Sequence, residues 1–248
     1  MRVKSLILLT LACLFCMFSC KKAPLSIGKT ITISRPLDDF NKVYIHDDIS
    51  MTLVKSDSCW IEITTGENLI DNITTKIDMS DSSFSIKNGN QMSFLRPYDY
   101  TLHATLYFKD IIFLKSSTSG YVDTYNQLNG QEKCKIVVDG ASGDMDITIN
   151  DCPRLEIIYR FGTSKANFHG GNNTNIYISK SSYGILDARD CTAEKVTVTN
   201  WSIGDCYISA SKVIKAEIFH LGDIYYKGDP EQITEEYGPI AKGRLIKL

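Results

Sequence analysis

The sequence lacks the features by which most enzymes and nucleic-acid-binding proteins are recognised. Its 27 Lys and Arg are balanced by 29 Asp and Glu, which excludes a large basic surface for nucleic acid. Its four histidines show no H-x-x-x-H or H-E-x-x-H spacing, so no metalloenzyme motif is present. A nucleophile elbow, a phosphate loop and a dinucleotide fingerprint are also missing. We therefore expect a non-catalytic protein that needs no cofactor and binds no nucleic acid.

Long helices and paired cysteines are lacking as well. Only residues 68–76 have the pattern of a helical turn, and no longer segment shows the helical period. Five cysteines follow Cys20, an odd number, and none forms a C-x-x-C pair, which argues against a zinc site or a redox motif. The pairs Cys134 with Cys152 and Cys191 with Cys206 would bridge neighbouring turns of a coil in an oxidising compartment. Small buried thiols in the core are the favoured interpretation.

The one long apolar run lies at the N-terminus. Residues 5–19 are nearly all apolar and follow two basic residues, the layout of a secretory signal that is too short to span a bilayer comfortably. Ser19 and Cys20 then supply the small residue and the thiol of a lipobox, with Met17 where Leu is usual. We predict a lipoprotein that is cleaved before Cys20 and held on the membrane by its lipid. A signal peptide without lipid and an uncleaved anchor are the alternatives.

The sequence pattern predicts five segments over the whole chain. The segments are the signal peptide 1–19, an anchor and linker 20–38, an N-terminal β-strand region 39–110, β-solenoid repeats 111–230 and a C-terminal cap or tail 231–248. The residues after Cys20, Lys-Lys-Ala-Pro, form no acidic cluster. We therefore favour the periplasmic side of the outer membrane over the cell surface.

The mature chain consists of short β-strands that become a repeat. Apolar and polar residues alternate from residue 29 onward, and turn residues separate the runs. In the second half a unit of about 20 residues recurs, marked by a small residue at Gly120, Gly143, Ser164, Gly184, Gly204 and Gly222. Such units bury their apolar faces only by stacking on one another. The prediction is an all-β, right-handed parallel β-helix-like solenoid of about six coils with additional N-terminal strands; a β-sandwich is the alternative.

The repeat also predicts which side chains share a face. The second and fourth residues after each corner should point inward, and the third should point outward. The outward positions are Asp123, Asp146, Asn167 and Asp187, followed by Tyr207 and Tyr225. This ladder is either a solvated acidic face, a site for a hard cation such as Ca²⁺ or the source of a glycosidase pair. Tyr207, Tyr225, Tyr226 and Trp201 would extend it as an aromatic platform for a glycan or a protein.

The C-terminal unit, Gly222-Asp-Ile-Tyr-Tyr-Lys-Gly-Asp-Pro230, resembles the closing signature of the head GIN domain family, named "putative auto-transporter adhesin". Residues 39–45, 67–75 and 140–143 are similar to its opening strands, its middle element and its Ser-Gly-Ala-Ser turns. The chain departs from the pattern at residues 161–164 and 220–221. The resemblance implies a β-solenoid in an exported, often lipid-anchored protein. We expect a binding or structural envelope protein whose partner is a glycan or another protein, with a polysaccharide-active enzyme and a Ca²⁺-binding regulatory protein as alternatives.

Overall fold

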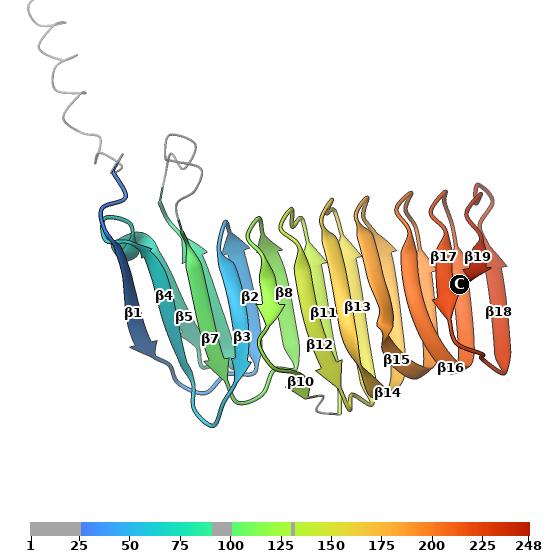
Figure 1. The fold of residues 1–248 in the computed structure, drawn as a ribbon, viewed down its shortest axis with the longest axis horizontal. Coiled ribbons are helices and arrows are strands. Elements are labelled where there is room, and N and C mark those ends of the chain that lie inside the picture. The colour runs from blue at the N-terminus through green and yellow to red at the C-terminus, as the bar shows by residue number, and fades with distance from the viewer. Residues whose placement is uncertain (1–25, 91–100, 130–131) are drawn as a thin grey trace, which may run out of the picture.

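The computed structural model describes residues 26–90, 101–129 and 132–248. The strands in these ranges stack along one long axis (Figure 1). This arrangement confirms the predicted β-solenoid of about six coils, and the β-sandwich is not formed. The helical turn predicted at residues 68–76 is shorter than expected, because only the 3₁₀ turn η1 (Ile70–Asn72) is helical and Ile73 already begins a strand.

Each coil contributes one strand to each of two sheets, and neighbours along both sheets are parallel. The first sheet consists of β6 (Ser83–Asn88), β2 (Lys42–Asp47), β8 (Phe113–Thr118), β11 (Cys134–Asp139), β13 (Arg154–Arg160), the second halves of β14 (Lys165–Ser181), β15 (Ile185–Asn200) and β16 (Cys206–Ile218), and β18 (Gln232–Tyr237). The second sheet consists of β7 (His103–Phe108), β3 (Ser50–Lys55), β9 (Val122–Thr124), β12 (Met145–Asn150), the first halves of β14, β15 and β16, β17 (Ile224–Lys227) and β19 (Leu245–Lys247). The short β10 (Leu128–Asn129) pairs with the end of β12.

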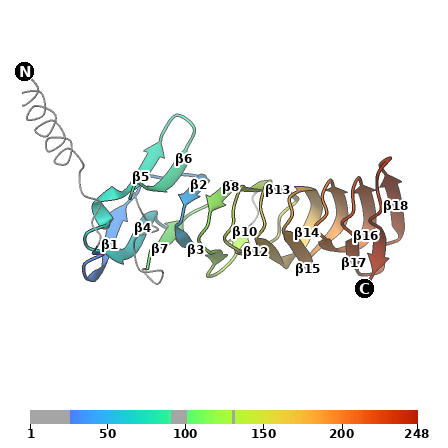
Figure 2. The same cartoon turned by 90° about the horizontal axis from the view of Figure 1, so that it is seen from above.

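The N-terminal end is built differently. The coil β2–β3 lies between the coil β6–β7 on one side and the coil β8–β9 on the other, so chain order and spatial order differ there. β4 (Trp60–Gly66) pairs antiparallel with β7, and β1 (Thr30–Pro36) pairs antiparallel with β4. β5 (Ile73–Asp78) pairs antiparallel with β6, and Figure 2 shows these two strands standing out to one side. Antiparallel strands therefore cover the first coil.

The core is a set of rows that run along the solenoid. One row of the first sheet joins residues in register whose side chains are all at most 3% exposed: Phe84, Val43, Leu114, Ile136, Ile157, Ile178, Val198 and Ala216. In the second sheet, the residues two positions after each predicted corner are all buried. The predicted inward direction also holds two residues further on, although Thr124 and Tyr226 at the two ends are only half-buried. The core thus repeats because the strands stack in register.

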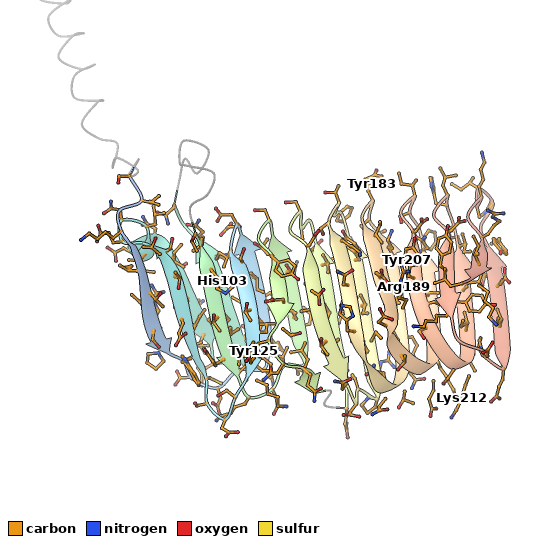
Figure 3. The ribbon with its side chains drawn as sticks, viewed as in Figure 1. His103, Tyr125, Tyr183, Arg189, Tyr207 and Lys212 are labelled. Atoms are coloured by element: carbon orange, nitrogen blue, oxygen red, sulfur yellow. The ribbon has the colours of Figure 1, made fainter. Side chains whose placement is uncertain are left out.

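The corners that lead from the first sheet to the second lie on one side of the solenoid, which we call the glycine edge. The other side is the opposite edge. Figure 3 shows Tyr183 on the glycine edge and both Tyr125 and Lys212 on the opposite edge. A Cβ atom on Gly143 would lie 1.9 Å from the carbonyl oxygen of Gly120 in the neighbouring coil. A glycine is required there because two backbones approach each other closely.

Candidate functional site

The outward row of the second sheet brings together the residues that the repeat predicts. Successive strand pairs align the members of this row, which we call the ladder: Asp123, Asp146, Asn167, Asp187, Tyr207 and Tyr225. Parallel strands lie ~4.8 Å apart, so six positions span about 24 Å. The ladder is therefore one continuous strip of polar and aromatic groups across the coils.

Asp146 forms contacts with two side chains of the next strand. His169 Nε2 lies 3.2 Å from Asp146 Oδ1, and Asn167 Nδ2 donates a hydrogen bond of 3.4 Å to Asp146 Oδ2. Asn167 also separates Asp146 from Asp187 along the row. The amide at this position thus removes two of the three like-charge contacts between neighbours that a row of four carboxylates would contain.

Asp187 is held by basic side chains on both sides. Arg189 Nε donates a hydrogen bond of 2.8 Å to Asp187 Oδ1, and Lys165 Nζ lies 3.9 Å from Asp187 Oδ2. The same hydrogen bond raises the pKa of Arg189 above its ordinary value. This is a structural ion pair. The proton donor of a glycosidase needs a more apolar environment.

The acidic end of the ladder is not a preformed metal site. Asp123 has one buried carboxylate oxygen, Oδ1, without a hydrogen-bond partner. Burial, and then the carboxylates of Asp146, Asp123 and Asp144, raise the pKa of Tyr121. Ca²⁺ needs six to eight oxygen ligands, and the described part of the chain contains no group of three or more His, Cys, Asp or Glu residues that could hold a metal. The carboxylates make this end of the ladder acidic, but in the described residues their oxygens do not converge on one point.

The aromatic end of the ladder forms a stack and not an open platform. The guanidinium of Arg189 lies 4.1 Å from the ring centre of Tyr207, and the rings of Tyr207 and Tyr225 are 4.8 Å apart and nearly parallel. Figure 3 shows Arg189 and Tyr207 close together on this sheet. Neither Trp201 nor Tyr226 extends the face as expected. Trp201 lies on the glycine edge against Phe219, and Tyr226 packs against the core because it occupies an inward position.

A polar groove of about 620 Å³ on the opposite edge was not predicted from the sequence. The segments that join the two halves of β14, β15 and β16 line it, together with the residues after β17. The lining residues are Asn172, Asn173, Thr174, Thr192, Ala193, Glu194, Ser209, Ala210, Ser211, Gly228 and Asp229. Small polar residues at equivalent positions of successive coils were the available signal, since stacking makes such positions adjacent.

A buried lysine lies under the glycine edge, in the row behind the corners. Lys180 Nζ donates hydrogen bonds to Ser202 Oγ (2.7 Å) and to the carbonyl oxygens of Gly204 (2.8 Å) and Ser182 (3.0 Å). Burial lowers the pKa of Lys180 to about 8. On the next coil Asn200, at the equivalent position, donates to the carbonyl oxygens of Gly204 and Gly222. These side chains bind corner carbonyls, which is a structural role.

The thiols of the described residues are part of the core. All five cysteines of the described residues are free and buried, as the favoured interpretation of the sequence has it. Burial raises the pKa of Cys134, Cys191 and Cys206 to about 12. A thiol is nucleophilic only as the thiolate, so these three side chains behave as small apolar groups.

The predicted lipid-attachment residue Cys20 and the predicted signal peptide lie outside the described residues. Among the residues that are described, no helix is long and apolar enough to cross a membrane.

Solved structures with the same fold include the following two bacterial proteins. A "putative adhesin" from Bacteroides fragilis NCTC 9343 is 18% identical, with a TM-score of 0.76 over 89% of this chain and 97% of that protein. A "putative lipid binding protein" from Parabacteroides distasonis ATCC 8503 is 18% identical, with a TM-score of 0.62 over 88% of this chain and 97% of that protein. At such identities the likeness shows the fold alone. A search of curated proteins finds no match. The family described as "Putative auto-transporter adhesin, head GIN domain" matches residues 39–230, which confirms the resemblance seen in the sequence, and the chain belongs to this family.

Proposed function

We propose that this protein is a non-catalytic, lipid-anchored adhesin of the cell envelope that binds an extended polar partner along the ladder of the second sheet. The family description and the adhesin names of similar structures support a binding role. The observation that carries the proposal is the ladder itself. It presents carboxylate, amide, guanidinium and phenol groups in one strip. Asp187 is paired with Arg189, which suits a structural role and not a catalytic one.

The partner that fits the strip best is a polysaccharide. The ladder offers hydrogen-bond donors and acceptors over about 24 Å, and the groove on the opposite edge is lined by Asn, Thr, Ser, Glu and Asp side chains. Such groups suit a chain of hydroxyls. Because the rings of Tyr207 and Tyr225 cover each other, we expect recognition by hydrogen bonds and not by stacking on sugar rings. A protein of the envelope is the alternative partner.

The anchor is proposed from the sequence. Ser19-Cys20 follows the apolar run and supplies the lipobox, and the absence of acidic residues directly after Cys20 favours the periplasmic face of the outer membrane. Intact mass of the purified full-length protein and of Cys20→Ala tests this anchor. The mass of a diacylglycerol should be present on the first protein and missing from the variant. Equal masses apart from the substitution would contradict it.

Binding is tested with an array of envelope polysaccharides and with a pull-down from envelope fractions, using the lipidated protein. Arg189→Ala opens the Asp187 pair and the tyrosine stack, so we expect about tenfold weaker binding. Lys109→Ala is the matched control, because Lys109 forms an exposed ion pair with Asp39, and neither residue belongs to the ladder or lines the groove. Equal binding by both variants would remove the ladder as the site. If neither polysaccharide nor protein is retained by the wild type, the adhesin proposal fails. Release of reducing ends from a bound glycan would favour an enzyme instead.

A further inference from the structure

The glycine edge carries a row of exposed apolar side chains, which we call the ridge. It consists of Phe161, Tyr183, Trp201, Ile203, Leu221 and Ile240, with exposed fractions of 75, 69, 54, 48, 48 and 66%. All six belong to the corners of successive coils. Single exposed apolar residues are ordinary on soluble proteins, whereas a contiguous row marks an interaction surface.

The geometry of the ridge keeps these side chains in solvent. Tyr183, Ile203 and Leu221 each directly precede the corner glycine, so they lie one above another at the ~4.8 Å strand spacing. The rings of Trp201 and Phe219 stack at 3.7 Å with an angle of 4° between them. Phe161 has a φ of 53°, a conformation that is unfavourable for a bulky residue, and the described residues leave its side chain 75% exposed. The corners thus hold apolar groups outward.

The chain enters the solenoid at this same edge. Thr30, the first residue of β1, pairs with Gly66, and Thr64 pairs with His103, which directly follows a corner. β1 therefore begins beside the corners (Figure 1). Cys20 precedes Thr30 by ten residues, a length of chain that spans at most about 35 Å. A lipid on Cys20 would hold the glycine edge, and not the opposite edge, near the membrane.

The shape and chemistry of the ridge favour lipid over a protein partner. The corners form a narrow edge along the solenoid (Figure 1), and a narrow edge enters a deformable headgroup layer more readily than it fits a rigid partner. Trp and Tyr are enriched at membrane interfaces, where an apolar ring meets water. We infer that the ridge inserts into the headgroup region of the membrane that carries the anchor, so that the solenoid lies along the bilayer. This inference rests on the anchor proposed above.

The chain contains a matched pair of reporters, because its two tryptophans lie on different edges. Trp201 belongs to the ridge. Trp60 stacks on Tyr107 at 3.9 Å, near the end of β7 that faces away from the corners, and so reports on the opposite edge. Trp60→Phe leaves Trp201 as the single reporter, and Trp201→Phe leaves Trp60.

The experiment reconstitutes both lipidated full-length variants into vesicles of phosphatidylethanolamine and phosphatidylglycerol that contain brominated phospholipid. We expect the bromine to quench Trp201 about twofold or more, and to leave Trp60 unchanged, because only an inserted ring lies near the acyl chains. Tyr183→Ser, Ile203→Ser and Leu221→Ser combined, with Trp201 as reporter, should lose most of this quenching. Tyr125→Ser, which removes an aromatic side chain that is 80% exposed on the opposite edge, should retain it.

Two readouts separate the anchor from the ridge. If intact mass shows the lipid but Trp201 is no more quenched than Trp60, the ridge inference is wrong and the anchor stands. If the mass shows no lipid, the anchor is wrong, and quenching of Trp201 after the protein is added to the same vesicles decides the ridge alone. Protection of Trp201 from aqueous acrylamide without quenching by bromine would mean that a second copy or residues 5–19 cover the ridge, and would also overturn the inference.

Discussion

The N-terminal part of the molecule, from β1 to β7, and the repeated part, from β8 to β19, reach a stacked architecture by different routes. In the repeated part every coil from β11 onward packs on the coil that precedes it in the chain, through parallel pairs only. In the N-terminal part the coil β2–β3 lies between two coils that both follow it in the chain, and antiparallel strands cover the end of the solenoid. The repeat therefore depends on equivalent corners with small residues, whereas the closure depends on long-range strand pairing.

The largest expected effect comes from a corner glycine of the repeated part. A Cβ on Gly143 would meet only backbone atoms of the neighbouring coil, the nearest at 1.9 Å. Gly143→Ala should therefore cost about 3 kcal/mol or more of unfolding free energy, or prevent folding. Gly89→Ala in the N-terminal part is the control, since its nearest contact is Asn72 O at 3.1 Å and its cost should stay under about 1 kcal/mol. Equal losses in urea unfolding would show that the corners are not special.

The buried row under the corners gives the next largest effect, as a pH dependence. At the position of Lys180 the N-terminal coils carry Ile45 and Ile86. Because the pKa of Lys180 falls from 10.5 to about 8 in the folded protein, the unfolded chain binds one more proton between these pH values. Stability should rise with pH across this window, by up to about 3 kcal/mol. Lys180→Met should lose that rise. Urea unfolding at several pH values measures it, and parallel curves for both proteins would contradict the assignment.

Antiparallel strands cover the N-terminal end of the solenoid, whereas β18 forms the edge of the first sheet at the C-terminal end. The core row that ends on Ala216 continues to Glu235 in the last strand, β18, so a charge stands where the other coils bury an apolar residue. Inward charges of this kind protect an open sheet edge from pairing with another chain. Glu235→Val should therefore promote dimers, whereas Glu236→Val, on the outward face, should leave a monomer. Sedimentation velocity distinguishes the two, and identical profiles would mean that another feature blocks this end.

The smallest effect concerns the ladder, which is charged in the repeated part and carries Thr52 and Thr105 in the N-terminal part. Arg189→Ala removes a half-exposed ion pair and its contact with Tyr207. We expect a loss of about 1 kcal/mol, after allowance for solvent screening. Lys109→Ala should have no measurable effect. A loss above that expected for Arg189 would indicate that the stack also fixes the position of neighbouring strands.

The repeated part was predictable because one spacing fixes both the register and the direction of each side chain. The small residues at Gly143 and Gly184 set corners, and the pairings of Met145 with Ala166 and of Leu186 with Cys206 follow the predicted alignment. Lys180 could have been found by the same logic, since it continues the inward alternation of Ile176 and Ile178. Lysine is almost never fully buried, and the corner carbonyls that hold this one cannot be read from the sequence.

The N-terminal closure could not be predicted from the same pattern. Strands β1, β4 and β5 alternate between apolar and polar residues as the parallel strands do, and alternation does not identify the partner of a strand. The aromatic platform failed for a related reason. Spacing gave the row of Tyr207 and Tyr225 correctly, but whether two rings cover each other depends on side-chain rotation, and Trp201 stands on a corner that the repeat does not place on a face.

The insertion of the coil β2–β3 between two later coils has a consequence for the order of folding. Residues 42–55 precede in the chain both of the segments that pair with them, β6–β7 on one side and β8–β9 on the other. Such non-local pairing is slow, because the chain loses entropy on closing a loop before the new contacts stabilise it. From β11 onward each coil can pair with the coil before it once that coil has folded, so folding there can proceed one coil at a time. We therefore expect the N-terminal third to be the slow part of folding, and a change in the number of coils at the C-terminal end should leave its strand pairing unchanged.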